Sequence, residues 1–330
     1  MDSSPVPTPK LSPFLPGTSI QFAWDSTSLG WLKECPRKYK YSMIDQWRTK
    51  SDSVHLDFGR WYHAGLELYD KYRATGASHD EALDHVVMTA MRWTWNYPED
   101  ADATGDPGTP WASDHPNKTR ETLIRSLIWY VDHFKEDPAQ TVILANGKPA
   151  VELTFKMELD WGPDENGRLQ TKDQPYLLCG HLDRVVSFAG GTYVMDRKTT
   201  TTTVAANYFD QYDPDNQMSL YTLAAKVIYQ TPVQGVIIDA VQIAVGFSRF
   251  SRGFTYRTDS QIEEWLADSR AWFALAEHYA TEGYWPMNDK SCHKYGGCPF
   301  RKVCSKAPEI RDKFLESDFT KKEWNPLVAR

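Results

Sequence analysis

Apolar residues in the first half of the chain recur at helical spacing. In residues 58–74, FGRWYHAGLELYDKYRA, they lie three and four positions apart, which predicts an amphipathic helix. Residues 26–45, 80–96 and 117–135 are also predicted to be helical, and the first of these ends in a basic and aromatic stretch. The stretch between the last two is rich in Pro, Gly and Asp and predicts a surface loop.

After residue 148 the pattern changes to strands. Residues 151–159, VELTFKMEL, alternate as a half-buried strand does, and two more strands are predicted at 175–188 and 192–200, around a Gly-Gly turn. A helix, a strand, a short strand and a long helix follow, at residues 215–230, 235–245, 253–258 and 260–280. This order predicts an α/β fold with a mixed-sheet core and a helical N-terminal elaboration.

The composition indicates a soluble globular protein, because 41% of the 330 residues are hydrophobic and 25% are charged. We expect a disordered proline-rich leader at 1–20, a helical region at 21–147, a core at 148–285 and a cysteine-rich segment at 286–330. The leader lacks the basic and apolar regions of a secretion signal, and no apolar run approaches the roughly 18 residues of a membrane span. A cytoplasmic location without membrane attachment is therefore expected.

The formal net charge of −7 argues against a generally basic protein that coats nucleic acid, although it leaves a local basic groove open. Residues 33–41 place four cations among tyrosines, which would line such a groove or form a solvated helix face. Trp93, Trp95 and Tyr97 would stack on unpaired bases or pack in the core.

Charged residues interrupt both strands of the predicted hairpin. Asp183 lies in one strand, and Asp196 and Lys198 share one face of the other, because side chains two residues apart in a strand point the same way. Two converging carboxylates repel each other unless a cation lies between them, and oxygen ligands suit Mg²⁺ or Mn²⁺. A lysine beside such a metal can orient a bound water, which suits phosphodiester hydrolysis. The alternative is a pair of surface ion pairs, each aspartate with the arginine that follows it.

Three of the five cysteines, Cys292, Cys298 and Cys304, fall within thirteen residues. An odd number of cysteines in a cytoplasmic chain argues against a disulfide framework, so this clustering indicates a bound metal or an iron–sulfur cluster. Cys179 lies in an apolar strand and is expected to be buried.

The hairpin resembles the core of the PD-(D/E)XK nucleases, in particular their RecB-type branch. That branch has a strand ending in G-x-x-D followed by one ending in D-x-K-T, matched here by residues 180–183 and 196–199. An upstream G-x-x-x-H helix is matched by residues 59–63, a glutamate on the strand before the hairpin by Glu152, and a later Q-x-x-x-Y helix by residues 217–221. Each motif is short, but the five occur in the right order on the right predicted elements.

This resemblance implies a restriction-endonuclease-like fold with a metal site in it. Asp183 and Asp196 would hold the divalent metal, and His63 would be a further ligand. Glu152 would ligate the metal or brace the site.

The resemblance also implies an activity. Lys198 would assist the attacking water, and Gln217 and Tyr221, one helical turn apart, would contact the scissile strand or brace the site. The predicted protein is a Mg²⁺- or Mn²⁺-dependent deoxyribonuclease, an exonuclease on single-stranded DNA or DNA ends. No G-x-x-x-x-G-K-[ST] phosphate loop occurs, so a helicase or recombination partner would supply any unwinding. The alternatives are a catalytically silent DNA-binding subunit and a zinc-stapled RNA-processing nuclease.

Members of the branch similar to the AddB nuclease domain and the CRISPR-adaptation exonucleases hold a [4Fe–4S] cluster on four cysteines. Cys35, followed by proline and by basic and aromatic residues, resembles the upstream ligand, and Cys298 and Cys304 match the final C-x5-C pair. Cys292 departs from the pattern, because five residues separate it from Cys298 where the family has two. A Gly-Gly pair in between would let the longer loop fold back. A four-ligand zinc site, with His293 as a substitute ligand, is the alternative.

Overall fold

The computed structural model describes residues 11–50, 53–97, 106–161, 174–229, 232–294 and 297–328. The chain forms two compact units, each assembled from separate stretches. Unit 1 contains residues 1–50, 154–180 and 260–330, and unit 2 contains residues 51–153 and 181–259. The segment boundaries given above stay predictions.

Unit 2 is built on the sheet that contains the charged hairpin. β7 (Tyr176–Phe188) and β8 (Gly191–Thr200) are antiparallel, β8 pairs in parallel with β9 (Val233–Ile243), and β9 pairs antiparallel with β10 (Ser248–Thr255). β5 (Gln140–Thr141) and β6 (Val151–Leu159) both pair with β7, and β6 and β7 run on into unit 1. The mixed sheet and its helices confirm the predicted α/β fold class.

The β7–β8 hairpin turns at Ala189 and Gly190, which have φ angles of 48° and 80°. Positive φ at both central positions is the geometry of a type I′ turn, whose twist matches that of the strands it joins. The turn lies one residue before the predicted Gly-Gly pair, so Gly191 begins β8 opposite Phe188. This tight turn fixes the register of the two charged strands.

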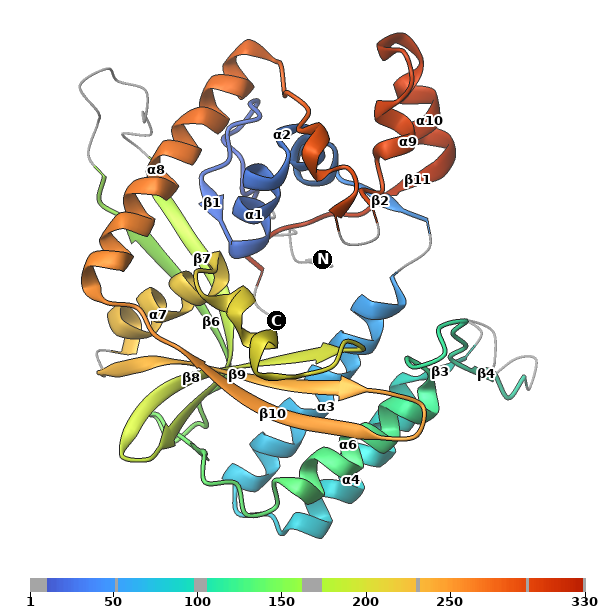
Figure 1. The fold of residues 1–330 in the computed structure, drawn as a ribbon, viewed down its shortest axis with the longest axis vertical. Coiled ribbons are helices and arrows are strands. Elements are labelled where there is room, and N and C mark those ends of the chain that lie inside the picture. Colours follow the sequence, from blue (N-terminus) through green and yellow to red (C-terminus); the bar gives the residue numbers. More distant parts are fainter. Residues whose placement is uncertain are drawn as a thin grey trace, which may run out of the picture. The chain divides into compact units, whose positions relative to one another are not determined.

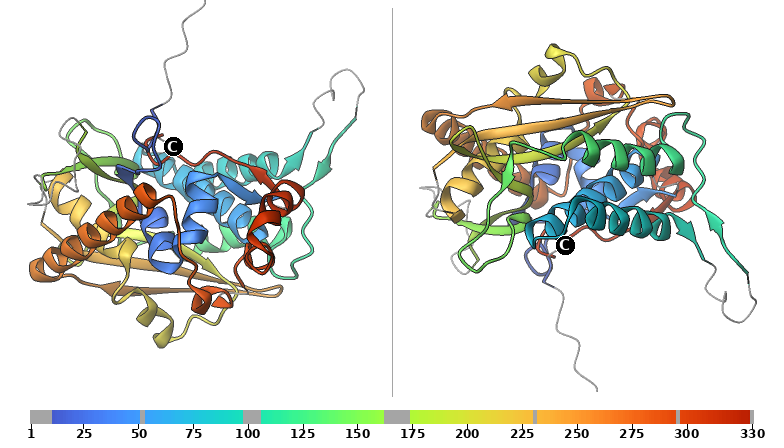
Figure 2. Two further views of the ribbon diagram at one scale, coloured as in Figure 1. Left: turned by 90° about the horizontal axis from the view of Figure 1, so that it is seen from above. Right: turned by 90° about the horizontal axis from the view of Figure 1, so that it is seen from below.

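Helices cover both faces of this sheet. α3 (Val54–Ala74), α4 (His79–Trp93) and α6 (Arg120–His133) lie side by side (Figures 1 and 2) and share a buried core with the end of β9. Arg197 contacts α3, whereas the next residue, Lys198, contacts α7 (Asn216–Tyr229). Because neighbouring strand residues point to opposite faces, α3 and α7 cover opposite faces of the sheet.

Polar side chains set the starts of these helices by accepting hydrogen bonds from the free backbone N–H groups of the first turn. Ser78 opens a capping box at α4, and Thr119 opens one at α6. Asp215 accepts hydrogen bonds from the N–H groups of Gln217 at 2.8 Å and Met218 at 3.0 Å, at the start of α7. The Asp215 cap therefore positions the first turn of α7, which carries Gln217.

Unit 1 joins two ends of the described chain (Figure 1). Its helical elements are α1 (Ser26–Glu34), α2 (Pro36–Tyr39), the π-helical turn η1 (Lys40–Ile44), α8 (Asp259–Glu282), α9 (Arg301–Cys304) and α10 (Arg311–Asp318). Trp24 of β1 (Ala23–Trp24) stacks on Tyr39 and on Phe273 of α8, with ring centroids 5.6 Å and 4.4 Å apart. β1 also pairs in parallel with β7, and β2 (Trp47–Thr49) pairs with β11 (Phe319–Lys321). Aromatic stacking and strand pairing thus hold the N-terminal segment against the C-terminal one.

Several elements differ from their predicted bounds. The predicted helix 26–45 is interrupted at Cys35, because Pro36 has no N–H to continue the helical hydrogen bonding. The predicted helix 80–96 ends at Trp93, and β3 (Trp95–Asn96) then pairs with β4 (Thr109–Pro110) in a hairpin that projects beyond α4 (Figure 2). The remaining short elements are η2 (Ala206–Tyr212), η3 (Asp289–Ser291) and η5 (Pro308–Ile310).

Parts of two predicted segments, residues 1–10 of the leader and 98–105 of the surface loop, lie outside the described residues. Residues 11–20 contain a turn closed by a hydrogen bond from the Leu15 N–H to the Ile20 carbonyl at 2.9 Å. None of the described helices combines the length and the apolar character that a membrane crossing requires.

Candidate active site

The two charged strands separate where the candidate site lies. In-register pairing of β7 with β8 ends at Arg184 and Met195. One residue beyond, an Asp183 carboxylate oxygen accepts a hydrogen bond from the backbone N–H of Arg197 at 2.9 Å, in place of a bond between strands. Asp183 and Asp196 are both buried, at 7% and 1% exposure. The hairpin therefore brings both predicted carboxylates to the opening of the sheet.

A histidine and a glutamate lie beside Asp183. His63 of α3 places its Nδ1 3.2 Å from Asp183 Oδ2. Glu152, near the start of β6, has a φ of 50°, a conformation that non-glycine residues disfavour and keep only where their surroundings impose it. One ligand atom from each of these three residues lies within 4.8 Å of the other two. The two carboxylates are oxygen ligands that suit Mg²⁺ or Mn²⁺, and the imidazole adds one nitrogen ligand, which divalent transition metals accept.

The His63–Asp183 contact is electrostatically strong. Burial alone would disfavour the charged form of each partner, but their mutual attraction outweighs it. The charge and hydrogen bond of His63 hold the pKa of Asp183 well below its usual range, and Asp183 raises the pKa of His63. The Asp183 carboxylate thus favours the charged form of His63, and a divalent cation would supply positive charge at the same place.

Asp196, Lys198, Gln217 and Tyr221 form a continuous chain of polar contacts. Lys198 Nζ lies 2.7 Å from Asp196 Oδ2 and donates to Gln217 Oε1, also at 2.7 Å. Gln217 Nε2 donates in turn to the Tyr221 hydroxyl at 2.8 Å. These contacts support the bracing role for Gln217 and Tyr221, whereas their contact with a substrate strand stays a prediction.

The ammonium of Lys198 is held in its charged form. Burial raises the pKa of Asp196, and the charge of Lys198 offsets this only in part. Burial would lower the pKa of Lys198, but the charge and hydrogen bond of Asp196 outweigh it and raise that pKa. Lys198 therefore stays positive at neutral pH, as a group that orients water or stabilises a developing negative charge requires.

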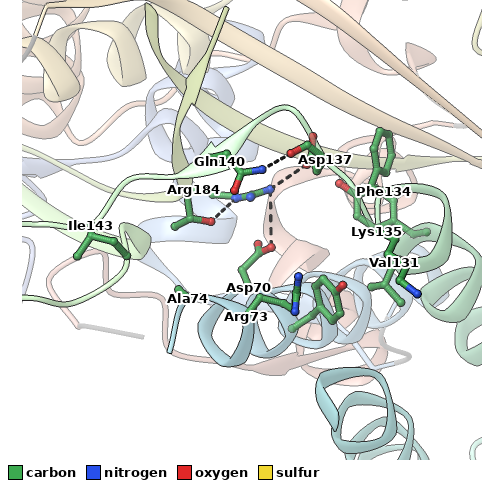
Figure 3. Close-up of a pocket in the computed structure, with 13 residues that line it drawn as sticks. Asp70, Arg73, Ala74, Val131, Phe134, Lys135, Asp137, Gln140, Ile143 and Arg184 are labelled. Carbon is green, nitrogen blue, oxygen red and sulfur yellow. Dashed lines mark hydrogen bonds and ion pairs between the residues drawn. The ribbon is translucent and has the colours of Figure 1, made fainter. Parts of the chain in front are cut away.

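The arginines that follow the two aspartates pair elsewhere. Arg197 lies 2.6 Å from Asp70 of α3, and Arg184 lies 3.4 Å from Asp137 and 3.7 Å from Asp70. Figure 3 shows Arg184 between Asp70 and Asp137 at the wall of a cavity of about 280 Å³. Asp183, with both arginines, is less than 9% exposed. The alternative of two surface ion pairs between neighbouring residues is therefore wrong.

The predicted cluster cysteines lie in unit 1. Cys35 lies between α1 and α2, the Cys298 N–H donates to the Cys292 carbonyl at 3.0 Å, and Cys292 and Cys304 line one cavity. Burial raises the pKa of the Cys298 and Cys304 thiols, and the nearby Cys35 adds to this. Gly297 has a φ of 106°, which glycine tolerates, and the other glycine of the predicted pair, Gly296, lies outside the described residues.

Three other predicted features are Cys179, the basic stretch at residues 33–41 and the aromatic stretch at residues 93–97. Cys179 is fully buried, as predicted. In the basic stretch, Lys38 pairs with Glu34 at 2.7 Å and Lys40 with Asp45 at 2.6 Å, so these two cations already have partners within unit 1.

In the aromatic stretch, Trp93 and Tyr97 are 41% and 64% exposed, and Trp95 donates its indole N–H to the Pro107 carbonyl at 2.8 Å. Stacking of bases on this stretch stays a prediction.

Sequence reasoning missed the residues that hold the site in place. Asp70 pairs with Arg197, Asp137 pairs with Arg184, and Asp215 caps the helix that carries Gln217. Each is an acidic residue in a helix or loop of ordinary composition, so no pattern in the sequence distinguishes it.

Known proteins resemble the chain to different degrees. Residues 26–305 match the sequence profile of the PD-(D/E)XK nuclease superfamily. The Gene 69 protein of Mycobacterium phage D29 is 27% identical over 210 residues, which span 59% of this chain and 66% of that protein, just under two thirds of its length.

Two solved structures are more distant. A proposed exonuclease from Eubacterium rectale has a TM-score of 0.49 and 9% identity, over 87% of this chain and 89% of its own. The protein SSO0001 has a TM-score of 0.29 and 10% identity, over 76% of each chain. At these scores neither similarity carries an argument about this chain.

The family profile spans the whole candidate site, from His63 on α3 to Tyr221 on α7. The mixed sheet that opens at Asp183 agrees with the restriction-endonuclease-like fold of that family. Family membership and the donor set around Asp183 both indicate divalent-metal chemistry. Sequence match, fold and site therefore agree that this chain belongs to the PD-(D/E)XK nuclease superfamily.

Proposed function

We propose that this chain is a Mg²⁺- or Mn²⁺-dependent deoxyribonuclease that degrades single-stranded DNA or DNA from its ends. Superfamily membership implies nuclease chemistry on DNA, and the preference for single strands and ends follows from the resemblance to the RecB-type branch. The observation that carries the proposal is the Lys198 ammonium, held by Asp196 and Gln217 in the same sheet opening as Asp183. A complete set of this kind, with both aspartates buried and the lysine half-buried, argues against a catalytically silent DNA-binding subunit.

The residues divide the work of hydrolysis between them. The divalent metal would be held by His63, Glu152, Asp183 and Asp196. When bound, it would polarise the phosphate of the substrate and activate a water. Lys198 orients that water and stabilises negative charge as it develops on the phosphate. Gln217 and Tyr221 limit the motion of the lysine, so that its charge is already in place when the substrate binds.

The test is cleavage of end-labelled DNA by the full chain, with single-stranded, double-stranded, linear and circular substrates in Mg²⁺ or Mn²⁺. Lys198→Met and Asp196→Asn should lower the rate by at least about 100-fold, because each removes a group that acts on the transition state. Lys226→Met is the matched control: Lys226 also lies 2.7 Å from an aspartate, Asp259, but in an exposed pair. It should cleave at the parent rate.

Each substrate tests a different part of the proposal. Cleavage of linear but not circular single strands supports an exonuclease, and equal cleavage of both would show an endonuclease. Faster cleavage of RNA than of DNA would support the RNA-processing alternative. If the parent cleaves no nucleic acid in either metal, or if Lys198→Met cleaves at the parent rate, the proposed chemistry is wrong.

We further propose that Cys35, Cys292, Cys298 and Cys304 hold a [4Fe–4S] cluster. The hydrogen bond between Cys298 and Cys292 and the cavity shared by Cys292 and Cys304 support a common site. The resemblance to the cluster-bearing members of the RecB-type branch favours a cluster over zinc, and metal analysis decides between the two.

A further inference from the structure

Lys118 is a buried lysine that lies directly before α6. The whole residue is 2% exposed. Its Nζ lies 3.4 Å from the Thr199 hydroxyl and 5.2 Å from the centre of the Phe58 ring. Neither neighbour carries a charge, so the ammonium has polar and aromatic contacts but no counter-ion among them.

The described residues around Lys118 do not supply a negative charge. Among the residues that the structure describes, no carboxylate lies within ion-pair distance of its Nζ. Two histidines are near it, His55 and His115, whose ring centroids lie 4.9 Å apart; burial lowers the pKa of His55, and the charge of Lys118 lowers it further. Burial lowers the pKa of Lys118 itself to about 8. A buried ammonium without a counter-ion is costly, so its retention needs a reason.

Other buried cations of unit 2 are paired. Arg197 lies 2.6 Å from Asp70, and Arg257 lies 2.9 Å from Asp213. The fold thus provides carboxylates where it buries a cation for structural purposes. Lys118 departs from this pattern, because its counter-ion is not among the described residues of the chain.

Lys118 contacts Thr199, which is the neighbour in sequence of the active-site residue Lys198. Thr199 directly follows Lys198 on β8 and faces α3. A Cβ added to Gly59 of α3, one turn before His63, would lie 3.8 Å from the Thr199 hydroxyl oxygen. The first turns of α3, the end of β8 and Lys118 therefore meet beside the opening that holds Asp183 and Lys198.

The backbone around Lys118 is firmly held. Its N–H donates to both the carbonyl oxygen and the Nδ1 of His115, each at 3.2 Å. Thr119, the next residue, caps α6. The position of the lysine is thus fixed in advance, and little ordering would be required when an anion binds.

We propose that Lys118 and the Thr199 hydroxyl form a binding subsite for a backbone phosphate of the DNA strand, next to the phosphate that is cleaved. This inference rests on the proposed function. A phosphate supplies the missing negative charge and accepts hydrogen bonds from both groups. Because phosphate contacts carry no sequence information, the subsite positions a strand without selecting its bases.

The test measures binding of a fluorescent oligothymidine by the full chain in Ca²⁺, which occupies oxygen sites without the cleavage expected in Mg²⁺ or Mn²⁺. Lys118→Met should weaken binding about 10-fold and reduce the dependence of log Kd on log salt by about 0.7, the value of one phosphate contact on a single strand. Thr199→Val should weaken binding by a smaller factor. Lys135→Met, which removes an exposed lysine near the other end of α6, should leave both quantities unchanged.

Thermal unfolding separates this role from a structural one. Lys118→Met removes a buried charge that has no counter-ion among the described residues, so its midpoint should equal or exceed that of the parent. A lower midpoint with unchanged salt dependence would make Lys118 a structural residue and overturn the subsite. If the parent cleaves and binds DNA while Lys118→Met binds equally well, the subsite fails and the nuclease proposal stands. If the parent neither binds nor cleaves DNA, both fail.

Discussion

His63 and His79 each contact a carboxylate, but their surroundings differ. His63 lies 3.2 Å from Asp183, in the group that offers three ligand atoms to one cation. His79, at the start of α4, lies 3.0 Å from Asp132 and 2.8 Å from the Tyr69 hydroxyl, and it belongs to no such group among the described residues. The two histidines therefore form a matched pair for separating metal binding from packing.

His63→Ala should raise the Mn²⁺ concentration needed for half-maximal cleavage at least about 10-fold, because a ligand contributes at least as much as the groups that orient ligands. High Mn²⁺ should restore part of the activity. His79→Ala should lower the melting temperature, since it removes the hydrogen-bonding partner of the buried Tyr69 hydroxyl, and should leave the metal dependence unchanged. Metal titrations and melting curves of both variants check this. An unchanged metal requirement in His63→Ala would remove it from the ligand set.

At the scale of elements, alternating charges tie together the helices and strands of unit 2. The members of this network are Asp70, Asp137, Asp239, Arg184, Arg197 and Arg252. They come from α3, the segment before β5, and each of the strands β7 to β10. Since the opposite charges are equal in number, the network satisfies the arginines that flank the active-site aspartates and keeps them on the α3 face.

Asp137→Asn should lower the free energy of unfolding by on the order of 2 kcal/mol at pH 7, since it removes one of the two carboxylates that Arg184 and Arg252 each contact. Burial opposes ionisation of Asp137, but the hydrogen bond and charge of Arg252 outweigh it and lower the pKa. A lowered pKa means that the stabilisation is present above the unfolded-state value, about 3.9, and is lost as pH falls through the folded-state pKa.

The difference between Asp137→Asn and the parent should therefore shrink as urea unfolding is repeated from pH 7 toward pH 3.5. Asp259→Asn is the control, because Asp259 pairs with Lys226 while its own side chain is 89% exposed. It should change the unfolding free energy little at any pH. If the difference in unfolding free energy between Asp137→Asn and the parent grows toward low pH, the pKa of Asp137 is not lowered in the folded protein.

At the scale of the whole molecule, unit 1 brings residues from both ends of the chain together. Tyr41 packs in one buried cluster with Phe300, Val303 and Leu315, and Cys298 and Cys304 border that cluster. A metal centre on Cys35 and the three later cysteines would add a covalent link between segments more than 250 residues apart in sequence.

Protein purified without oxygen should be brown and contain about four irons per chain. Cys35→Ser, Cys298→Ser and Cys304→Ser should each lose the iron and make both chain ends more sensitive to protease, because all three would hold one cluster. Cys292→Ser tests the position that departs from the family spacing. Cys179→Ser, at a fully buried position in β7, should keep the iron. A colourless protein that contains one zinc per chain would show that these cysteines bind zinc instead of a cluster. Protein without bound metal would refute the link.

The sequence by itself determined the elements and the chemistry of the hairpin. Helical spacing predicted α3, strand alternation predicted β6 to β9, and the charges inside two strands predicted a site at Asp183, Asp196 and Lys198. These features are local: periodicity and motif spacing depend on residues close together in the chain. Where local propensity was weak, as in the two-residue β1 and in α10, the sequence predicted no element.

The tertiary structure decided which side chains meet. That Gln217 fixes Lys198, that Arg197 turns away from Asp196 to Asp70, and that Lys118 is buried beside Thr199 are contacts between residues 19 to 127 positions apart. No pattern in the sequence marks Lys118, which follows an ordinary polar loop, because its burial and its lack of a counter-ion among the described residues depend on the packing of α3, α6 and β8. Long-range packing thus decided how the charges of the site are compensated.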